Sequence, residues 1–129
     1  MALRIAIDAN RYADFFRGVE AAVRPIREAQ SVYLPFIVLA EIRAGFKHGN
    51  HERENERNLQ EFLKAHHVTV LFADEATTHF YAQIYLDLRR AGTPIPTNDI
   101  WIAALVIQHD LVLVTRDRHF EAVPRMARM

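Results

Sequence analysis

Residues 3–10 are Leu-Arg-Ile-Ala-Ile-Asp-Ala-Asn, a short apolar run that ends at the carboxylate of Asp8. Short runs rich in β-branched residues are typical of strands that are buried on both faces. The chain has four such runs and a shorter candidate near Ala127; the runs are Leu3–Ile7, Ser31–Leu34, Val68–Phe72 and Leu111–Thr115. Because longer helical patterns separate them, the sequence predicts a parallel sheet covered by helices.

The segments between these strands carry apolar residues at helical spacing. Pro35 is expected to open a strongly apolar helix that closes near Gly45 and Gly49, and Asn98 is predicted to be an N-cap. The predicted helices are Asn10–Arg17, Val19–Gln30, Phe36–Phe46, His51–His66, Asp74–Arg90 and Asp99–His109. The expected fold class is therefore α/β, a three-layer sandwich with a mostly parallel central sheet of four or five strands flanked by helices.

Length and composition narrow the classes of protein. With 129 residues, half of them hydrophobic, the chain is expected to form one domain over residues 1–129. The net charge is zero, so no basic excess indicates nucleic acid; 14 of the 16 cations are Arg, which suits phosphate contacts, although codon usage explains the bias equally well. The absence of Cys excludes disulfide frameworks, thiolate zinc sites and cysteine nucleophiles. We expect a soluble cytoplasmic protein without signal peptide or membrane span.

Four carboxylates lie in or against apolar segments: Asp8, Glu41, Asp99 and Asp117. Carboxylates are rarely buried without compensation, and four that meet would repel each other until protons or a divalent cation neutralised them. Asp8 directly follows the first predicted strand, and Asp117 lies two residues after the fourth. Ligands of α/β sheets bind beyond the carboxyl ends of the strands, so a metal-dependent site is the leading hypothesis.

The other two carboxylates lie on predicted helices. Asp99 shares a helical face with Ile102, Ala103 and Val106. Glu41 has apolar and small residues at helical spacing, and the small ones are expected to let its helix approach another backbone closely; these neighbours are Ile37, Val38, Ala44 and Gly45. A carboxylate in such surroundings needs a partner.

Each carboxylate also has a simpler interpretation. Asp8 could be a turn residue at a strand end, and Asp99 could complement the positive end of a helix. Glu41 could pair with a structural arginine such as Arg43, and Asp117 could lie in a solvated loop. No single one of the four is decisive.

Four motifs occur in order along the chain: IAIDAN at Ile5–Asn10, LAEIRAG at Leu39–Gly45, NDIWIAA at Asn98–Ala104 and LVTRDRHFEAVP at Leu113–Pro124. The ordered set resembles the PIN-domain family, and within it the VapC-type toxins of toxin–antitoxin pairs. The resemblance spans essentially the full length and implies a PIN-like fold.

In that family the four acidic positions bind divalent metal and cut RNA, and here they correspond to Asp8, Glu41, Asp99 and Asp117. The resemblance implies Asp8 and Asp99 as main metal ligands, and Glu41 and Asp117 as additional or water-mediated ligands. Oxygen ligands favour Mg²⁺, with Mn²⁺ as the alternative, and no organic cofactor is expected. The products would carry 5′-phosphate and 3′-hydroxyl ends.

Further residues are expected to support this site. A small polar residue commonly follows the first aspartate of the family, but this chain has Ala9, so Asn10 is expected to supply the polar contact. Thr115 is expected to hydrogen-bond near the site, whereas His119 is expected to serve packing or surface hydrogen bonding. Four cations flank the motifs and are the expected phosphate contacts: Arg11, Arg43, Arg116 and Arg118.

The resemblance also implies partners: an RNA substrate, a cognate VapB-type antitoxin and a second copy in a homodimer, but no membrane. The alternatives are a PIN-type RNA-processing nuclease outside a toxin–antitoxin pair and a non-catalytic PIN-like binding module. A phosphoacceptor signalling module would also gather aspartates at strand ends. It would need adjacent acids after the first strand and a lysine at a strand end, which this sequence lacks.

Overall fold

The computed structural model describes residues 2–129 and contains a five-stranded sheet of order β3-β2-β1-β4-β5. Its strands are β1 (Arg4–Ile7), β2 (Ser31–Pro35), β3 (Val68–Leu71), β4 (Val112–Val114) and β5 (Ala127–Arg128). Every pairing is parallel, and Ile5 of β1 lies opposite Val32 of β2 and Val112 of β4. The predicted sheet is confirmed, including the terminal strand near Ala127.

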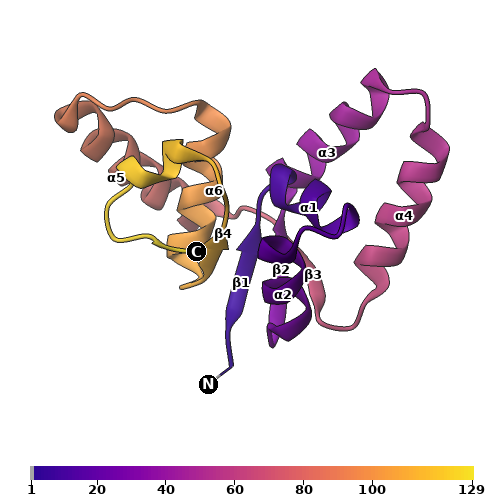
Figure 1. Cartoon of the computed structure of the whole chain (residues 1–129). Helices are drawn as coiled ribbons and strands as arrows, with labels where there is room; N and C mark the ends of the chain where they lie inside the picture. The colour runs from indigo at the N-terminus through magenta and orange to yellow at the C-terminus, as the bar shows by residue number, and fades with distance from the viewer. Residues whose placement is uncertain (1) are drawn as a thin grey trace.

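Helices connect the strands and flank the sheet. They are α1 (Ala9–Phe16), α2 (Glu20–Glu28), α3 (Phe36–His48), α4 (Glu52–Lys64), α5 (Glu75–Ala91) and α6 (Thr97–Gln108), and a short 3₁₀ helix, η1 (Arg118–Ala122), precedes β5. In Figure 1, α5 and α6 lie on the β4 side of the strands, and α3 and α4 lie on the β3 side. Helix α2 passes in front of β2, and α1 lies near the upper ends of β1 and β2. The predicted three-layer α/β fold is confirmed.

The most apolar segments of the sequence form the core. Ile5, Ala6 and Ile7 of β1 are completely buried, and six consecutive or near-consecutive apolar residues of α6 are at most 5% exposed. An element that is packed on all sides has no polar face, which explains why β1 and α6 are apolar almost throughout.

One predicted helix end is confirmed, and one predicted N-cap is wrong. Helix α3 passes through Gly45 and ends at His48 with Gly49 as its C-cap, so it closes near Gly49 as predicted. Helix α6 begins at Thr97, with Pro96 rather than Asn98 at the N-cap position. Proline has no N–H to leave unsatisfied, and its φ of −56° already suits the start of a helix.

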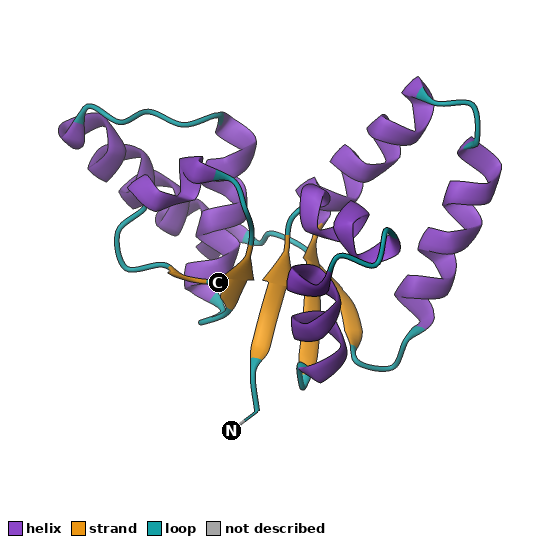
Figure 2. Cartoon of the chain, viewed as in Figure 1, coloured by secondary structure: helices purple, strands orange, loops and turns teal. Residues whose placement is uncertain are grey.

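The connections change direction at the centre of the sheet. From β1 the chain moves outward through β2 to β3, and it then returns to the other side of β1 to form β4. In sheets of this kind, ligands bind in the crevice outside the carboxyl ends of the two strands where the order reverses. In Figure 2 the carboxyl ends of β1 and β4 lie side by side. Among the described residues, no helix combines the length and apolarity needed to cross a membrane.

Candidate functional site

Asp8 leaves the carboxyl end of β1 and forms the N-cap of α1. Its side chain is buried; one oxygen accepts a hydrogen bond from the backbone N–H of Arg11 at 2.9 Å, and the other accepts one from the Thr115 hydroxyl. The Thr115 oxygen in turn accepts the backbone N–H of Asp117 at 3.0 Å. Thr115 therefore links the Asp8 carboxylate to the backbone of Asp117, and it hydrogen-bonds within the site.

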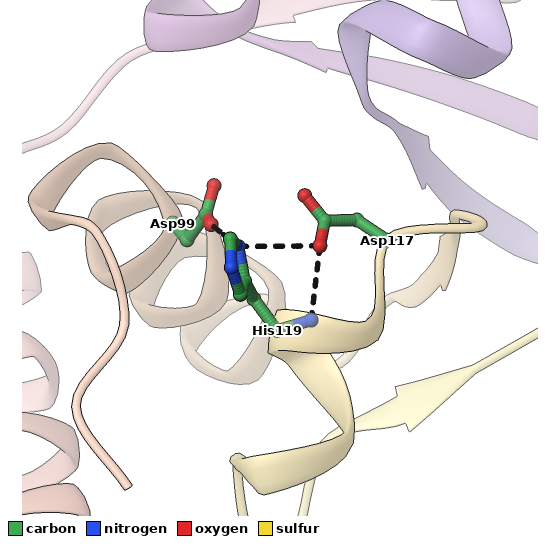
Figure 3. A group of neighbouring side chains, drawn as sticks. All are labelled: Asp99, Asp117 and His119. Carbon is green, nitrogen blue, oxygen red and sulfur yellow. Dashed lines mark hydrogen bonds and ion pairs between the residues drawn. The ribbon is translucent and has the colours of Figure 1, made fainter.

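Asp99, Asp117 and His119 form a second group at the same edge, drawn in Figure 3. Asp99 lies in the first turn of α6, and Asp117 is the N-cap of η1, where it accepts the His119 backbone N–H at 2.9 Å. The His119 Nδ1 atom lies 2.9 Å from Asp99 Oδ2 and 3.2 Å from Asp117 Oδ1. The ring thus bridges two carboxylates that come from different segments.

Glu41 comes from α3 and is half-buried. Its predicted apolar surroundings are only partly correct, because Ile37 and Val38 are buried whereas Ala44 and Gly45 are exposed. The predicted close backbone approach at these small residues is wrong: a side chain at Gly45 would meet no atom within 4 Å. Glu41 instead lies on a cleft of about 420 Å³ between α1, α3 and α4; its lining also includes Tyr12, Ala13, Phe16, Arg17, Ile42, Gly45, Phe46, Asn55 and Asn58.

The charges of the four carboxylates act on one another's pKa values. Burial raises the pKa of Asp8, and the charge of Asp117 adds to that rise, although hydrogen bonds from Thr115 and Arg11 oppose it. Burial also raises the pKa of Glu41, opposed by a hydrogen bond from Asn98 and reinforced by the charges of Asp99, Asp8 and Asp117. Burial likewise raises the pKa of Asp99, and the His119 hydrogen bond opposes this rise.

The donor set fits a divalent cation. One ligand atom each from Asp99, Asp117 and His119 lies within 4.8 Å of the other two. The charge of Asp8 raises the pKa of Asp99, and the charges of Asp99 and Asp117 raise the pKa of Glu41. Carboxylate oxygens suit Mg²⁺, and Mn²⁺ accepts an imidazole nitrogen as well. A divalent cation would compensate the mutual repulsion that raises these pKa values.

The arginines near the motifs have different surroundings. Arg43 forms a two-point ion pair with Glu56 of α4, at 3.2 and 2.9 Å, so the alternative that it neutralises Glu41 is wrong. Arg118 is exposed in η1. Arg11 and Arg116 both bind the buried carboxylate of Asp14, which also binds Arg17. Asp14 therefore ties α1 to the segment that follows β4.

Three residues near the site were either not predicted from the sequence or predicted to have a different role. His119 contacts two carboxylates, Asn98 lowers the pKa of Glu41 rather than capping α6, and Asp14 binds three arginines. The spacing of Asp14, three residues from both Arg11 and Arg17, is a helical ion-pair signal that was available. Asn10, predicted to contact the site, is exposed and has no hydrogen bond to the four carboxylates among residues 2–129.

Comparisons with known proteins agree with this architecture. The sequence model of the PIN domain matches residues 5–126. Ribonuclease VapC4 of Mycobacterium tuberculosis (strain ATCC 25618 / H37Rv) is 30% identical over 121 residues, which cover 93% of this chain and 85% of that protein. The structure of VapBC2 from Rickettsia felis, bound to a DNA fragment from their promoter, has a TM-score of 0.87 at 20% identity and 98% coverage of both chains. FitAcB from Neisseria gonorrhoeae has a TM-score of 0.76 at 28% identity, with 97% of this chain and 96% of that chain covered.

Proposed function

Because this chain belongs to the PIN domain family, we propose that it is a metal-dependent endoribonuclease and the toxin of a VapBC-type toxin–antitoxin pair. The observation that carries the proposal is the meeting of four carboxylates from four separate segments at the switch point of the sheet. The name of the VapC4 relative supports the activity, and the VapBC structures support the pairing with an antitoxin. We treat residues 1–129 as one PIN domain.

We assign Asp8 and Asp99 as the main metal ligands, and Glu41 and Asp117 as additional or water-mediated ligands, for Mg²⁺ or Mn²⁺. When bound, the cation supplies positive charge for the scissile phosphate and lowers the pKa of a water molecule. The protein orients these ligands: Thr115 and the Arg11 backbone fix the two oxygens of Asp8, and His119 holds Asp99. The carboxylates are thereby preorganised for phosphodiester hydrolysis.

Two protein partners are part of the proposal. The Glu41 cleft is lined by Tyr12, Phe16, Ile42 and Phe46, which suits an apolar segment of an antitoxin that would reach the acidic site. A homodimer is supported by Phe36 and Phe72, which stack at 6.1 Å on the surface although Phe72 is 67% exposed. Exposed apolar pairs of this kind are typical of surfaces that a partner covers.

The activity is tested by incubating the purified protein with total RNA, with and without added Mg²⁺ or Mn²⁺. We expect discrete fragments with 5′-phosphate ends only when the metal is present, because the carboxylates alone cannot stabilise the charge that develops on phosphate. Fragments are mapped by sequencing of phosphorylated 5′ ends. Fragments that persist unchanged in EDTA would reject the metal-dependent mechanism.

Thr115→Val tests the link between Asp8 and Asp117. Valine keeps the shape of threonine but removes the hydroxyl that donates to Asp8 and accepts from the Asp117 backbone. Losing one buried charge-assisted hydrogen bond should lower the initial cleavage rate about tenfold. The control is Thr78→Val, an exposed position on α5 whose hydroxyl bonds only Glu75. Equal rates in the two variants would show that Thr115 does not orient the site.

A further inference from the structure

Asp14 is a buried carboxylate that the proposed chemistry does not use. Its side chain is 6% exposed, and it accepts hydrogen bonds from Arg11 Nη1 at 3.1 Å, Arg17 Nη2 at 2.8 Å and Arg116 Nε at 3.0 Å. Burial alone would raise the pKa of Asp14, but the hydrogen bonds and charges of these arginines lower it below its ordinary value. Asp14 is therefore ionised and firmly bound.

The cluster carries more positive charge than Asp14 requires. One guanidinium would compensate one carboxylate, yet three surround Asp14; the charge of Arg11 also acts on Asp8, which leaves Arg17 and Arg116 for one carboxylate. The Nε atom of Arg11 is buried and has no hydrogen-bond partner among residues 2–129, which is costly for a charged donor. An excess of guanidinium groups beside a site for phosphate chemistry indicates that an anion completes the cluster.

Arg116 is the member best placed to bind that anion. It stands between Thr115 and Asp117, and its side chain is 49% exposed. Its Nε atom donates to Asp14, and within the described chain neither its Nη1 nor its Nη2 atom makes a hydrogen bond. The guanidinium is thus held by one atom and free at its outer edge, which is the edge that binds two oxygens of a phosphate.

We propose that Asp14 is a positioning residue that fixes Arg116, so that the free edge of its guanidinium holds an RNA phosphate beside the acidic centre. The identity of the polyanion as RNA rests on the proposed function. In this arrangement Asp14 lowers the entropic cost of ordering a long side chain, because Arg116 is already oriented before RNA binds. The alternative is a purely structural cluster that ties α1 to the segment after β4.

The test measures RNA binding separately from cleavage. All variants are made in an Asp99→Asn background, and binding of a fluorescein-labelled, mixed-sequence, single-stranded RNA is followed by anisotropy in Mg²⁺ between about 50 and about 200 mM salt. The variants are Arg116→Gln, Arg116→Lys and Asp14→Asn. The matched control is Arg24→Gln, which removes the same charge from an exposed arginine of α2 whose pairs with Glu20 and Glu28 are long, at 3.7 and 3.8 Å.

Arg116→Gln should weaken binding about tenfold or more relative to Arg24→Gln and reduce the salt slope by about 0.7, the contribution of one single-strand phosphate. Arg116→Lys and Asp14→Asn should keep the slope but weaken binding several-fold, because the charge remains while its orientation is lost. If Asp14→Asn does not fold, the proposal is decided by the RNA affinity of Arg116→Lys, a substitution at a half-exposed position.

Four results would overturn the proposal, and the first three concern affinity alone. Arg116→Gln could bind RNA as well as Arg24→Gln; Arg116→Lys could bind as well as the parent; or Asp14→Asn could bind RNA more tightly, which would mean that Asp14 sequesters Arg116. A lower melting temperature of Asp14→Asn with unchanged affinity would identify a structural role only. Failure of the proposed function looks different: the protein would not cleave RNA in any metal, whatever the Arg116 variants do to binding.

Discussion

Asp8→Asn is expected to lower RNA cleavage at least about a hundredfold, which corresponds to about 2.7 kcal/mol of transition-state stabilisation. Asp8 is assigned as a main metal ligand, and an asparagine at this position can offer only one neutral oxygen. The change removes a negative charge from the point where Glu41 and Asp99 also face. The measurement is the initial rate of RNA cleavage in saturating metal.

The same substitution should stabilise the metal-free protein at neutral pH. Burial raises the pKa of Asp8, so its ionised form is destabilising in the fold, and asparagine removes that charge. Asparagine is also a good N-cap and can still accept the Arg11 N–H at the start of α1. The melting temperature in EDTA should therefore rise while activity is lost.

The control is Glu20→Gln, which neutralises an exposed carboxylate at the start of α2. It should leave both the cleavage rate and the melting temperature close to those of the parent protein. If Asp8→Asn retained cleavage within a few-fold of Glu20→Gln, Asp8 would not be a main ligand and the assignment of the site would be wrong.

The sequence was sufficient to predict the sheet because its central strands are largely buried. The runs that contain Ile5, Val32 and Leu113 are mostly apolar, and a parallel sheet between helices is the fold in which such runs are covered. The same rule placed Asp8 and Asp117 at one edge, since the carboxyl ends of β1 and β4 lie together.

The remaining part of the site depends on contacts between distant segments, which local patterns do not encode. Glu41 was predicted to lie among apolar residues, but Ala44 and Gly45 are exposed, and Gly45 lines the cleft together with Glu41. His119 was assigned to packing or surface hydrogen bonding, because nothing in its own segment reveals that Asp99 of α6 lies 2.9 Å from its ring.

The roles of the arginines could not be predicted either, because they also depend on contacts between distant segments. Arg43 was an expected phosphate contact and a candidate partner of Glu41; it pairs instead with Glu56, whose position depends on α4, and its contact with phosphate stays a prediction. Arg116 was an expected phosphate contact, but only the fold shows that its Nε atom is bound by Asp14 from α1, 102 residues earlier in the chain. Helix spacing can predict Arg11–Asp14–Arg17, but it cannot predict the third arginine.

Addition of Mg²⁺ or Mn²⁺ to the metal-free protein should raise its melting temperature at neutral pH. A ligand that binds only the folded state at a concentration about 100 times its Kd stabilises it by about 2.7 kcal/mol, which for a chain of this size is a shift on the order of 10 °C. The shift should be lost in Asp99→Asn and kept in Glu20→Gln. An equal ionic strength of KCl separates specific binding from screening.

The size of this shift should depend on pH in a defined direction. The pKa values of Asp8, Glu41 and Asp99 are raised in the folded state, so between about pH 4 and those raised values the folded chain holds more protons than the unfolded chain. The metal-free protein should therefore lose stability as the pH rises through this window.

Metal binds the ionised carboxylates and competes with these protons, so the stabilisation by metal should grow as the metal-free stability falls. Thermal melts from pH 4 to pH 8, with and without metal, measure both trends. A metal-induced shift that is the same at every pH would show that the cation binds elsewhere than at these buried carboxylates.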